Sequence, residues 1–291
     1  MESDLRTNPY ALPGGLLPRI GRYRVNGTTL YTEVRGSGRA LLMIHAGAED
    51  AEEYRPIAER LTEFTVVTYD RRGTLRSGRD DWPGQGSVQH ADDAAALLRA
   101  LGLRDVLVFG GSSGGNIALQ LALRHPALVW RALVWEPGYL GQVQGGRDAV
   151  RRMRQAGAGH LAAHPGDWAG AYASVLRALG LAPSEPGPAT LAAPRARSWY
   201  DEREDGNAEA IMRDDIPIMS RELVNEAQLA SAAGDIRFAY GTRTRPIFRD
   251  VAIRLAGIRG MVPHTVDGVG HVLLYQPDVE AAFIRGQAAA E

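Results

Sequence analysis

The segment from Val106 to Gln120 constrains the fold more than any other part of the chain. It begins with an apolar strand, Val106-Leu-Val-Phe-Gly110, and ends in a segment with helical periodicity. Between them lies the pattern Gly-x-Ser-x-Gly, with glycines at 110 and 114 around Ser112. Side chains beside the serine would collide in so tight a turn, so the glycines favour a strand–turn–helix unit that exposes one hydroxyl. The flanking strand and helix favour this interpretation over an ordinary Gly/Ser turn, and we expect Ser112 to be a nucleophile.

Short apolar runs alternate with amphipathic segments along most of the chain. The apolar runs predict strands at 22–25, 30–34, 40–44, 64–69, 105–109, 131–135, 236–240 and 261–266. The amphipathic segments predict helices at 53–61, 88–101, 116–125, 247–256 and 277–286. Asn26-Gly27 predicts a hairpin between the first two strands. This alternation implies right-handed crossovers, so we expect an α/β fold with a mostly parallel, doubly wound sheet of eight strands.

The alternation stops between residues 137 and 234. This region is helix-rich and is interrupted by Ala182-Pro-Ser-Glu-Pro-Gly-Pro188, a breaker cluster that separates two helical groups. The pattern predicts a helical lid, or cap, over 137–234, inserted after the strand that ends at Glu136. We expect an N-terminal arm over 1–20 and a core domain formed by 21–136 and 235–291.

Composition limits the partners that the chain is expected to bind. The 291 residues carry a formal net charge of −1, so nothing in the charge favours a nucleic acid or an anionic membrane, and a small neutral molecule fits better. The chain has no cysteine, which excludes disulfides and thiolate metal sites. We find neither a signal-peptide pattern nor an apolar stretch of membrane-spanning length, so we expect a cytoplasmic protein, and the sequence leaves a homodimer open.

One of the seven histidines is placed to act on Ser112. Ligands of open α/β sheets bind at the carboxyl ends of the strands, and His271 follows the last predicted strand and the flexible loop 267–270. His160 and His164 are four residues apart in the lid, but no His-Glu-x-x-His pattern accompanies them, so we expect no metal there. His271 is therefore the expected general base.

The loop after the strand at 40–44 consists of His45 and three small residues, Ala46-Gly47-Ala48. Small residues leave backbone amides free to point at a developing negative oxygen, so we expect the amides of Gly47 and Ser113 to form an oxyanion hole. The alternative is a tight turn with a structural histidine.

With these motifs the chain resembles α/β-hydrolases of the serine esterase and lactonase type, over about Tyr23 to Arg285. The resemblance rests on four motifs: His45-Ala-Gly47, Tyr69-Asp-Arg-Arg-Gly-Thr-Leu-Arg-Ser77, Gly110 to Gly115, and Gly268-Val-Gly-His271. Leu75 departs from the glycine that is usual in the second motif. The resemblance implies a Ser–acid–His triad that requires no metal or organic cofactor.

The position of the acid is the second departure from the family. Members commonly carry it in a Gly-x-x-Asp pattern after the strand at 236–240, where this chain has Gly241-Thr-Arg-Thr244. Thr244 cannot serve as a carboxylate. Glu136 follows the strand next to the nucleophile, and zearalenone lactonases and certain haloalkane dehalogenases, which the chain resembles here, place their acid at this position. We therefore expect Glu136 to be the triad acid, with Asp250 and Asp267 as alternatives.

These residues together predict the hydrolysis of a carboxylic ester or lactone through an acyl-enzyme on Ser112. The expected substrate is apolar, aromatic or macrocyclic, because the lid and the loop after the strand at 40–44 supply residues that could line a pocket: Ala46, Ala48, Trp168, Tyr172, Trp199, Tyr200, Met212 and Met219. The lid residues could equally form the packing core of the lid. Arg71 and Arg72 could brace a loop or contact substrate. The alternative functions are a cyclase, a lyase, an acyltransferase or a ligand-binding protein on the same fold.

Overall fold

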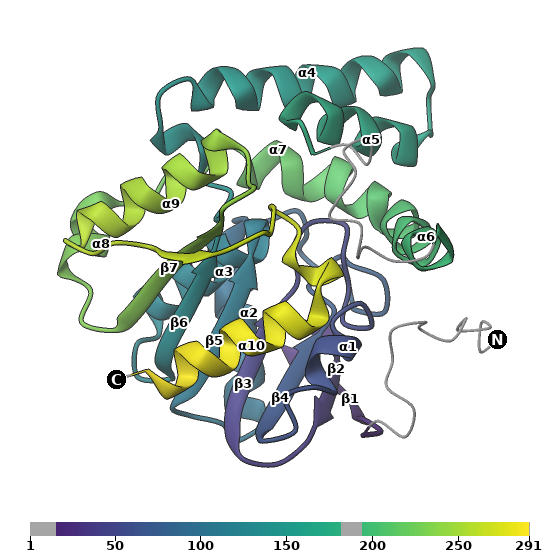
Figure 1. Ribbon diagram of the computed structural model, residues 1–291. Helices are drawn as coiled ribbons and strands as arrows, with labels where there is room; N and C mark the ends of the chain where they lie inside the picture. The colour runs from purple at the N-terminus through teal and green to yellow at the C-terminus, as the bar shows by residue number, and fades with distance from the viewer. Residues whose placement is uncertain (1–15, 182–193, 291) are drawn as a thin grey trace.

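The protein is built around one twisted sheet of eight strands (Figure 1). The computed structural model describes residues 16–181 and 194–290, without the side chains of 194–201. The strands lie in the order β1-β2-β4-β3-β5-β6-β7-β8. Their bounds are β1 Arg19–Val25, β2 Thr28–Arg35, β3 Arg39–Ile44, β4 Phe64–Tyr69, β5 Val106–Gly111, β6 Val129–Trp135, β7 Asp235–Gly241 and β8 His264–Val266. Strands β1 and β2 are antiparallel to their neighbours and all other pairs are parallel, which confirms the predicted fold class.

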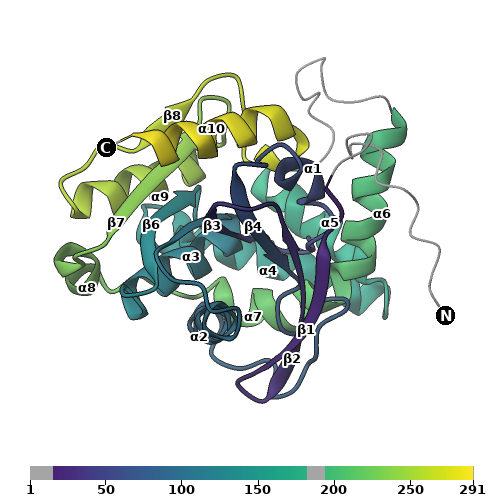
Figure 2. The ribbon, with the colours of Figure 1, turned by 90° about the horizontal axis from the view of Figure 1, so that it is seen from below.

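Helices cover both faces of the sheet (Figure 2). Strand pleating sends alternate side chains to opposite faces, so Leu41 and Leu107 pack on one face while Leu42 and Val108 pack on the other. The helices of the first face are α1 Arg55–Ala58 and α10 Pro277–Ala289. Those of the second are α2 Ser87–Ala100, α3 Ser112–Arg124 and α9 Pro246–Ile258. Burial on both faces explains why the central strands are continuously apolar.

Some element bounds differ from the prediction for local reasons. The predicted strand at 261–266 is shortened to β8, because Pro263 has no N–H to donate to a ladder. The predicted helix at 53–61 is reduced to α1. Helix α3 begins at Ser112, four residues earlier than predicted. The low helix propensity of Gly114 and Gly115 is the reason that the sequence does not predict its first turn as helical. Strand β1 begins at Arg19, three residues earlier than predicted and inside the predicted N-terminal arm.

The insertion between β6 and β7 consists of helices, as predicted. Its elements are a 3-10 turn Leu140–Gln142, α4 Gly146–Ala163, α5 Trp168–Leu179, α6 Pro194–Ala210, a π-turn Ile211–Asp215, α7 Ile216–Met219 and α8 Glu226–Ser231. In Figure 1, α4 to α7 lie beyond the carboxyl ends of the parallel strands, and we call them the lid helices. The breaker cluster at 182–188 lies outside the described residues.

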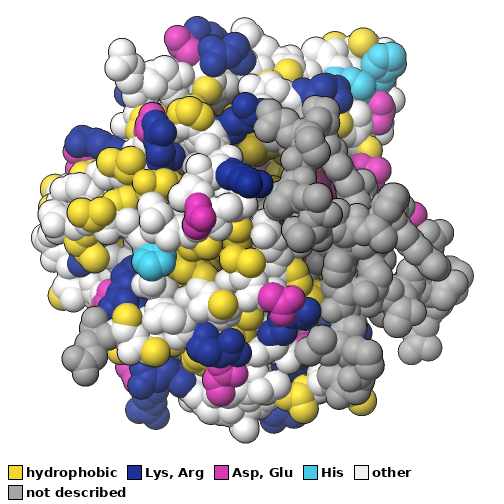
Figure 3. Space-filling model, viewed as in Figure 1, with side chains coloured by type: hydrophobic (Ala, Val, Ile, Leu, Met, Phe, Trp, Pro, Cys, Tyr) yellow, Lys and Arg dark blue, Asp and Glu magenta, His cyan; other side chains and the backbone are white. Residues whose placement is uncertain are grey.

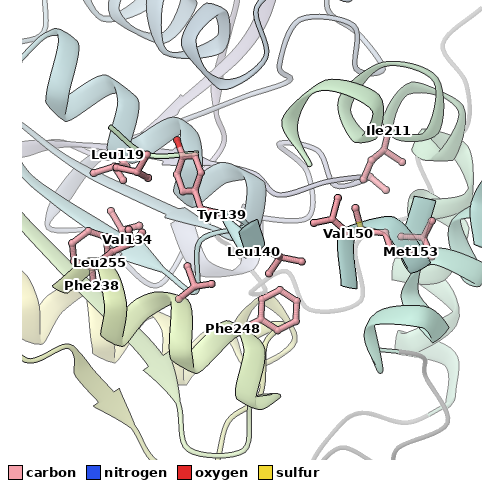
Figure 4. Close-up of a cluster of buried hydrophobic side chains, with 14 of the residues drawn as sticks. Leu119, Val134, Tyr139, Leu140, Val150, Met153, Ile211, Phe238, Phe248 and Leu255 are labelled. Atoms are coloured by element: carbon pink, nitrogen blue, oxygen red, sulfur yellow. The ribbon is translucent and has the colours of Figure 1, made fainter. Parts of the chain in front are cut away.

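One apolar cluster joins the core to the lid helices (Figure 4). Phe238 and Leu255 belong to its core end, and Met153 and Ile211 to its lid end. Phe248 of α9 belongs to the same cluster. The lid helices are thus fixed to the sheet by continuous packing, which positions the residues that face the strand ends.

The outer surface is mixed in character. On the face drawn in Figure 3, charged side chains of both signs are interspersed with apolar ones. Across residues 16–181 and 194–290, no helix combines the length and the apolar character needed to cross a bilayer.

Candidate active site

Ser112 stands at the junction of β5 and α3 in a strained backbone conformation. Its φ is +51°, in the left-handed region that costs a non-glycine residue about 1–2 kcal/mol. A Cβ on Gly110 would overlap the carbonyl of Gly114, and a Cβ on Gly114 would overlap the carbonyl oxygen of Ile44. Both glycines are therefore required for the close approach of the turn to the sheet, and the predicted strand–turn–helix geometry is confirmed.

Glu136 and His271, which are 135 residues apart in the sequence, form a direct hydrogen bond. The Nδ1 atom of His271 lies 2.7 Å from Oε2 of Glu136. An ionised carboxylate only accepts hydrogen bonds, so Nδ1 carries the proton and Nε2 is left as the acceptor of a further proton. Glu136 directly follows β6 with a φ of +39°, and its amide donates to the carbonyl of Ala239 on β7. This backbone conformation fixes the position of the carboxylate at the sheet edge.

Two further donors satisfy the Glu136 carboxylate. The amide of Gly241 donates to Oε1 at 2.8 Å, and the hydroxyl of Thr244 donates to Oε2 at 2.6 Å. The carboxylate is fully buried, so these bonds offset the loss of water. Thr244, at the position where the resembled family carries its acid, thus becomes a partner of the acid on the neighbouring strand.

The two alternative acids lie elsewhere. Asp267 accepts a hydrogen bond from Thr242, at 2.9 Å, on the exposed surface. Asp250 is about half exposed and pairs with Arg249. The geometry therefore favours Glu136 over both.

Two aromatic side chains hold His271 in place. The ring of Phe248 stacks on the imidazole with centroids 3.8 Å apart, and the indole N–H of Trp135 donates to the His271 carbonyl at 2.9 Å. We did not predict these supports or that of Thr244. The sequence marks Phe248 and Trp135 only as core residues of an amphipathic helix and a strand, and their partner is distant in the chain.

The loop after β3 presents its backbone to the turn that carries Ser112. His45 donates from Nδ1 to the carbonyl of Ala46, at 2.8 Å, and accepts the amide of Arg71 at Nε2. Burial, and then the charge of Arg71, hold the pKa of His45 well below its usual value, so it is a neutral structural residue. The alternative interpretation of this loop, a tight turn with a structural histidine, therefore describes His45, and the oxyanion role of the loop stays a prediction.

The predicted oxyanion-hole residues, Gly47 and Ser113, lie next to each other. A Cβ on Gly47 would overlap Ile211 of the lid and would lie 3.7 Å from the Ser113 hydroxyl oxygen, so the loop and the turn are adjacent. Ser113 is the second residue of α3, where the helix supplies no acceptor for its amide. Within the described ranges neither amide donates a hydrogen bond, whereas the amide of Ala46 is taken by Glu49.

A cavity of about 200 Å³ lies over these residues and is bordered by Ser112, Ser113 and His271. Of the predicted substrate-binding residues, Ala46, Tyr172 and Met219 line it. The side chains of Trp199 and Tyr200 are outside the described residues.

Three other residues predicted to line a pocket are not among the residues that border this cavity: Ala48, Trp168 and Met212. All three pack in the apolar cluster between core and lid. A helical stripe in the sequence cannot distinguish a residue facing this cluster from one facing the cavity.

Arg71 and Arg72 brace the structure. Arg72 binds both oxygens of buried Asp93, at 2.7 and 2.8 Å. Arg71 binds Asp215 of the lid, at 2.7 Å, and the carbonyl of Ala46, at 3.1 Å. Neither arginine is among the residues that line the cavity in the described part of the chain. Arg71 therefore ties the lid to the loop that presents Gly47.

One part of the cavity wall is acidic, which we did not predict. Glu49, Glu204 and Glu280 all border the cavity. The signal in the sequence is the position of Glu280 on α10, one turn before buried Ile284 and next to buried Ala281. A glutamate on the apolar stripe of a helix marks a carboxyl that points inward.

Comparison with known proteins agrees with the fold. The family model described as alpha/beta hydrolase fold matches residues 39–137. Over 127 residues the chain is 39% identical to the uncharacterized hydrolase YraK of Bacillus subtilis (strain 168), covering 43% of this chain and 47% of that protein. Over 102 residues it is 39% identical to the putative carbamate hydrolase RutD of Caulobacter vibrioides, covering 33% of this chain and 38% of that protein. The matches span less than half of each relative.

A similarity to a solved structure extends over nearly the whole chain. The crystal structure of an alpha/beta hydrolase from Sphaerobacter thermophilus DSM 20745 superposes with a TM-score of 0.69 at 25% identity, over 91% of this chain and 99% of that one. The sheet order, the strained serine turn and these similarities lead to one conclusion. The chain belongs to the α/β-hydrolase superfamily.

Proposed function

We propose that this protein is a serine hydrolase that cleaves a carboxylic ester or lactone through an acyl-enzyme on Ser112. The observation that carries the proposal is the hydrogen bond of 2.7 Å between Glu136 and His271, because His271 borders the same cavity as Ser112. The names of the relatives, a hydrolase and a putative carbamate hydrolase, agree with the reaction class.

In the proposed mechanism the Ser112 hydroxyl attacks the substrate carbonyl while Nε2 of His271 takes its proton. Glu136 holds the ring in the tautomer with the proton on Nδ1 and stabilises the imidazolium that forms. The amides of Gly47 and Ser113 bind the oxyanion, and each such donor contributes about 10²–10³ in rate. His271 then protonates the leaving alcohol and activates the water that releases the acid.

The cavity wall favours an acyl group with a substantial apolar part. Most of the lining is apolar, and the lid contributes part of it, with Met153, Leu176, Ile211 and Met219 as examples. A serine nucleophile also disfavours dehalogenation and epoxide opening, which use an aspartate at this position. The alternative of a non-hydrolytic enzyme drew on the missing acid at 244, and the Glu136 geometry removes that reason.

Rapid-mixing kinetics with p-nitrophenyl butyrate test the proposal. We expect a burst of about one equivalent of p-nitrophenol from the wild-type protein and none from Ser112→Ala, whose turnover falls by about 10⁴-fold or more. A parallel panel of aryl carbamates and resorcylic macrolactones ranks the acyl classes. Turnover in Ser112→Ala equal to that of the wild type would overturn the proposal.

A further inference from the structure

We propose that the cavity contains a second, anionic subsite, formed by Glu280 and Glu49, that binds the protonated amino group of an amine-bearing substrate. The inference rests on the proposed function, since it describes another part of the wall of the same cavity. It names the chemical class of substrate more narrowly than an apolar ester or lactone.

Glu280 carries the inference. Its side chain is 1% exposed, it borders the cavity, and neither of its carboxyl oxygens has a hydrogen-bond partner. Buried side-chain oxygens in folded proteins almost always have a partner, and a carboxyl group is among the least tolerable exceptions. A polar group that borders a cavity without an internal partner is explained by a ligand that supplies one.

Glu49 places a second carboxyl group close to the first. It follows the loop that presents Gly47, and its Oε2 accepts the amide of Ala46 at 2.7 Å and the Tyr54 hydroxyl at 2.8 Å. Burial raises the pKa of Glu280 well above its usual value, and the negative charge of Glu49 raises it further. The two carboxyl groups are therefore electrostatic neighbours, and the Tyr54 hydroxyl interacts with both. Glu49 also interacts with other charged or titratable groups, which are Glu53, Arg71, Tyr172, His271 and Tyr275.

The described residues supply little positive charge to this wall. The chain contains no lysine, and no arginine is among the cavity-lining residues in the described ranges. Arg71, whose charge acts on Glu49, is already bound to Asp215 at 2.7 Å. A cation that enters the cavity would meet the carboxyl group of Glu280, which has no hydrogen-bond partner, beside that of Glu49, on which the charges of Arg71 and His271 act.

An ammonium group matches this environment better than other ligands do. It carries one positive charge and donates up to three hydrogen bonds, enough for both oxygens of Glu280 and one of Glu49. On binding, neutral Glu280 loses its proton to solvent and becomes the carboxylate that pairs with the amine. A carboxylate ligand would be repelled, and a hydroxyl would donate one bond without charge.

Calorimetric titration of the Ser112→Ala protein separates this inference from catalysis. The probes are n-hexylamine and 1-hexanol at about pH 8, where the amine is protonated. We expect the amine to bind at least about tenfold more tightly, because only it pairs with a carboxylate. Titrations in buffers of different ionisation enthalpy should show release of a proton, up to one per amine bound.

Substitutions on helix α10 give the matched comparison. Glu280→Gln should weaken hexylamine binding at least about tenfold and abolish the proton release, because the amide carries no charge. Asp278→Asn removes an exposed carboxylate from the same helix, 83% accessible and paired with Arg60, and should change neither.

Two results would overturn the subsite: hexylamine binding no tighter than hexanol, or binding and proton release that persist in Glu280→Gln. The first needs no variant at position 280, so it holds even if that variant fails to fold. Amine binding by a protein that hydrolyses no ester would instead contradict the proposed function while leaving the subsite in place.

Discussion

Two buried carboxyl groups, Glu136 beside His271 and Glu280 in the cavity wall, differ in their partners. Glu136 is 0% exposed and Glu280 is 1% exposed, so burial does not distinguish them. Glu136 accepts hydrogen bonds from Gly241, Thr244 and His271, whereas Glu280 accepts none. A carboxylate whose partners are all internal fixes the geometry of the protein. A carboxyl without partners is a standing cost to stability that a ligand can relieve.

Glu136→Gln tests the carboxylate whose partners are all internal, and it has the largest expected effect. The amide preserves the shape but removes the charge that stabilises the imidazolium and selects the tautomer, so kcat should fall by about 10⁴-fold. Steady-state kinetics on p-nitrophenyl butyrate measure the change, with Asp250→Asn as a control at an exposed acid. A loss of less than about tenfold would remove Glu136 from the triad.

A double variant that moves the acid from position 136 to position 244 tests whether the carboxylate acts through His271. Thr244 donates to Glu136 at 2.6 Å, so a carboxylate at 244 can approach the imidazole once the glutamate is removed. Glu136→Ala combined with Thr244→Asp should recover at least about tenfold of the activity that Glu136→Ala alone loses. Thr244→Asp alone should be impaired, because two adjacent carboxyl groups cannot both ionise. A double variant no better than Glu136→Ala would contradict the placement.

Replacing the unpaired carboxyl group of Glu280 should stabilise the protein, whereas replacing the paired carboxylate of Glu136 should destabilise it. Glu280→Met replaces a carboxyl that lacks partners by an apolar side chain of similar size, so the free energy of unfolding at about pH 8 should rise by about 1–3 kcal/mol. Denaturant titrations measure it. Glu136→Met should instead destabilise the protein, because it leaves Gly241, Thr244 and His271 without their acceptor.

The pH dependence of that gain follows from the raised pKa of Glu280. Above the unfolded pKa near 4.5 the folded state holds a proton that the unfolded state has lost, so stability falls as pH rises toward the folded pKa, by at most about 1.4 kcal/mol per pH unit. The advantage of Glu280→Met should therefore widen between about pH 5 and pH 8. An advantage that narrows over this range would mean that Glu280 is ionised and paired.

Substrate preference should show the smallest effect. p-Nitrophenyl 6-aminohexanoate and p-nitrophenyl heptanoate have acyl chains of equal length that end in an ammonium or a methyl group. We expect kcat/KM to favour the amino ester by about tenfold, and Glu280→Gln to remove most of that preference. A preference for the heptanoate in the wild-type protein would indicate that the chain end does not reach Glu280.

The sequence predicted the parts of the molecule that local constraints determine. Continuous apolar runs located the central strands, and the spacing of Gly110 and Gly114 around Ser112 located the turn, because backbone collisions act within a few residues. The choice of His271 followed from the rule that parallel strands end at one edge of the sheet, and the choice of Glu136 followed from the same rule together with the family resemblance.

The remaining features depend on contacts between distant segments. Thr244 and Glu136 are 108 residues apart, and nothing near Thr244 indicates that its hydroxyl binds a carboxylate. Trp168 is aromatic and sits in the lid, yet it faces the packing cluster, since helical periodicity does not say which neighbour a stripe meets. The sequence around Glu280 does indicate an inward-pointing carboxyl group, because the glutamate lies on the apolar stripe of a helix, but we did not make that prediction.

Intact-protein and peptide mass spectrometry after treatment with a fluorophosphonate test the central claim most directly. The reagent phosphonylates serine nucleophiles that an adjacent base activates. We predict one adduct per chain, located on Ser112, lost in Ser112→Ala and kept in Ser220→Ala, which removes another hydroxyl from the same cavity. An unlabelled wild-type protein, or an adduct on a different residue, would contradict the assignment of Ser112, His271 and Glu136 as one catalytic unit.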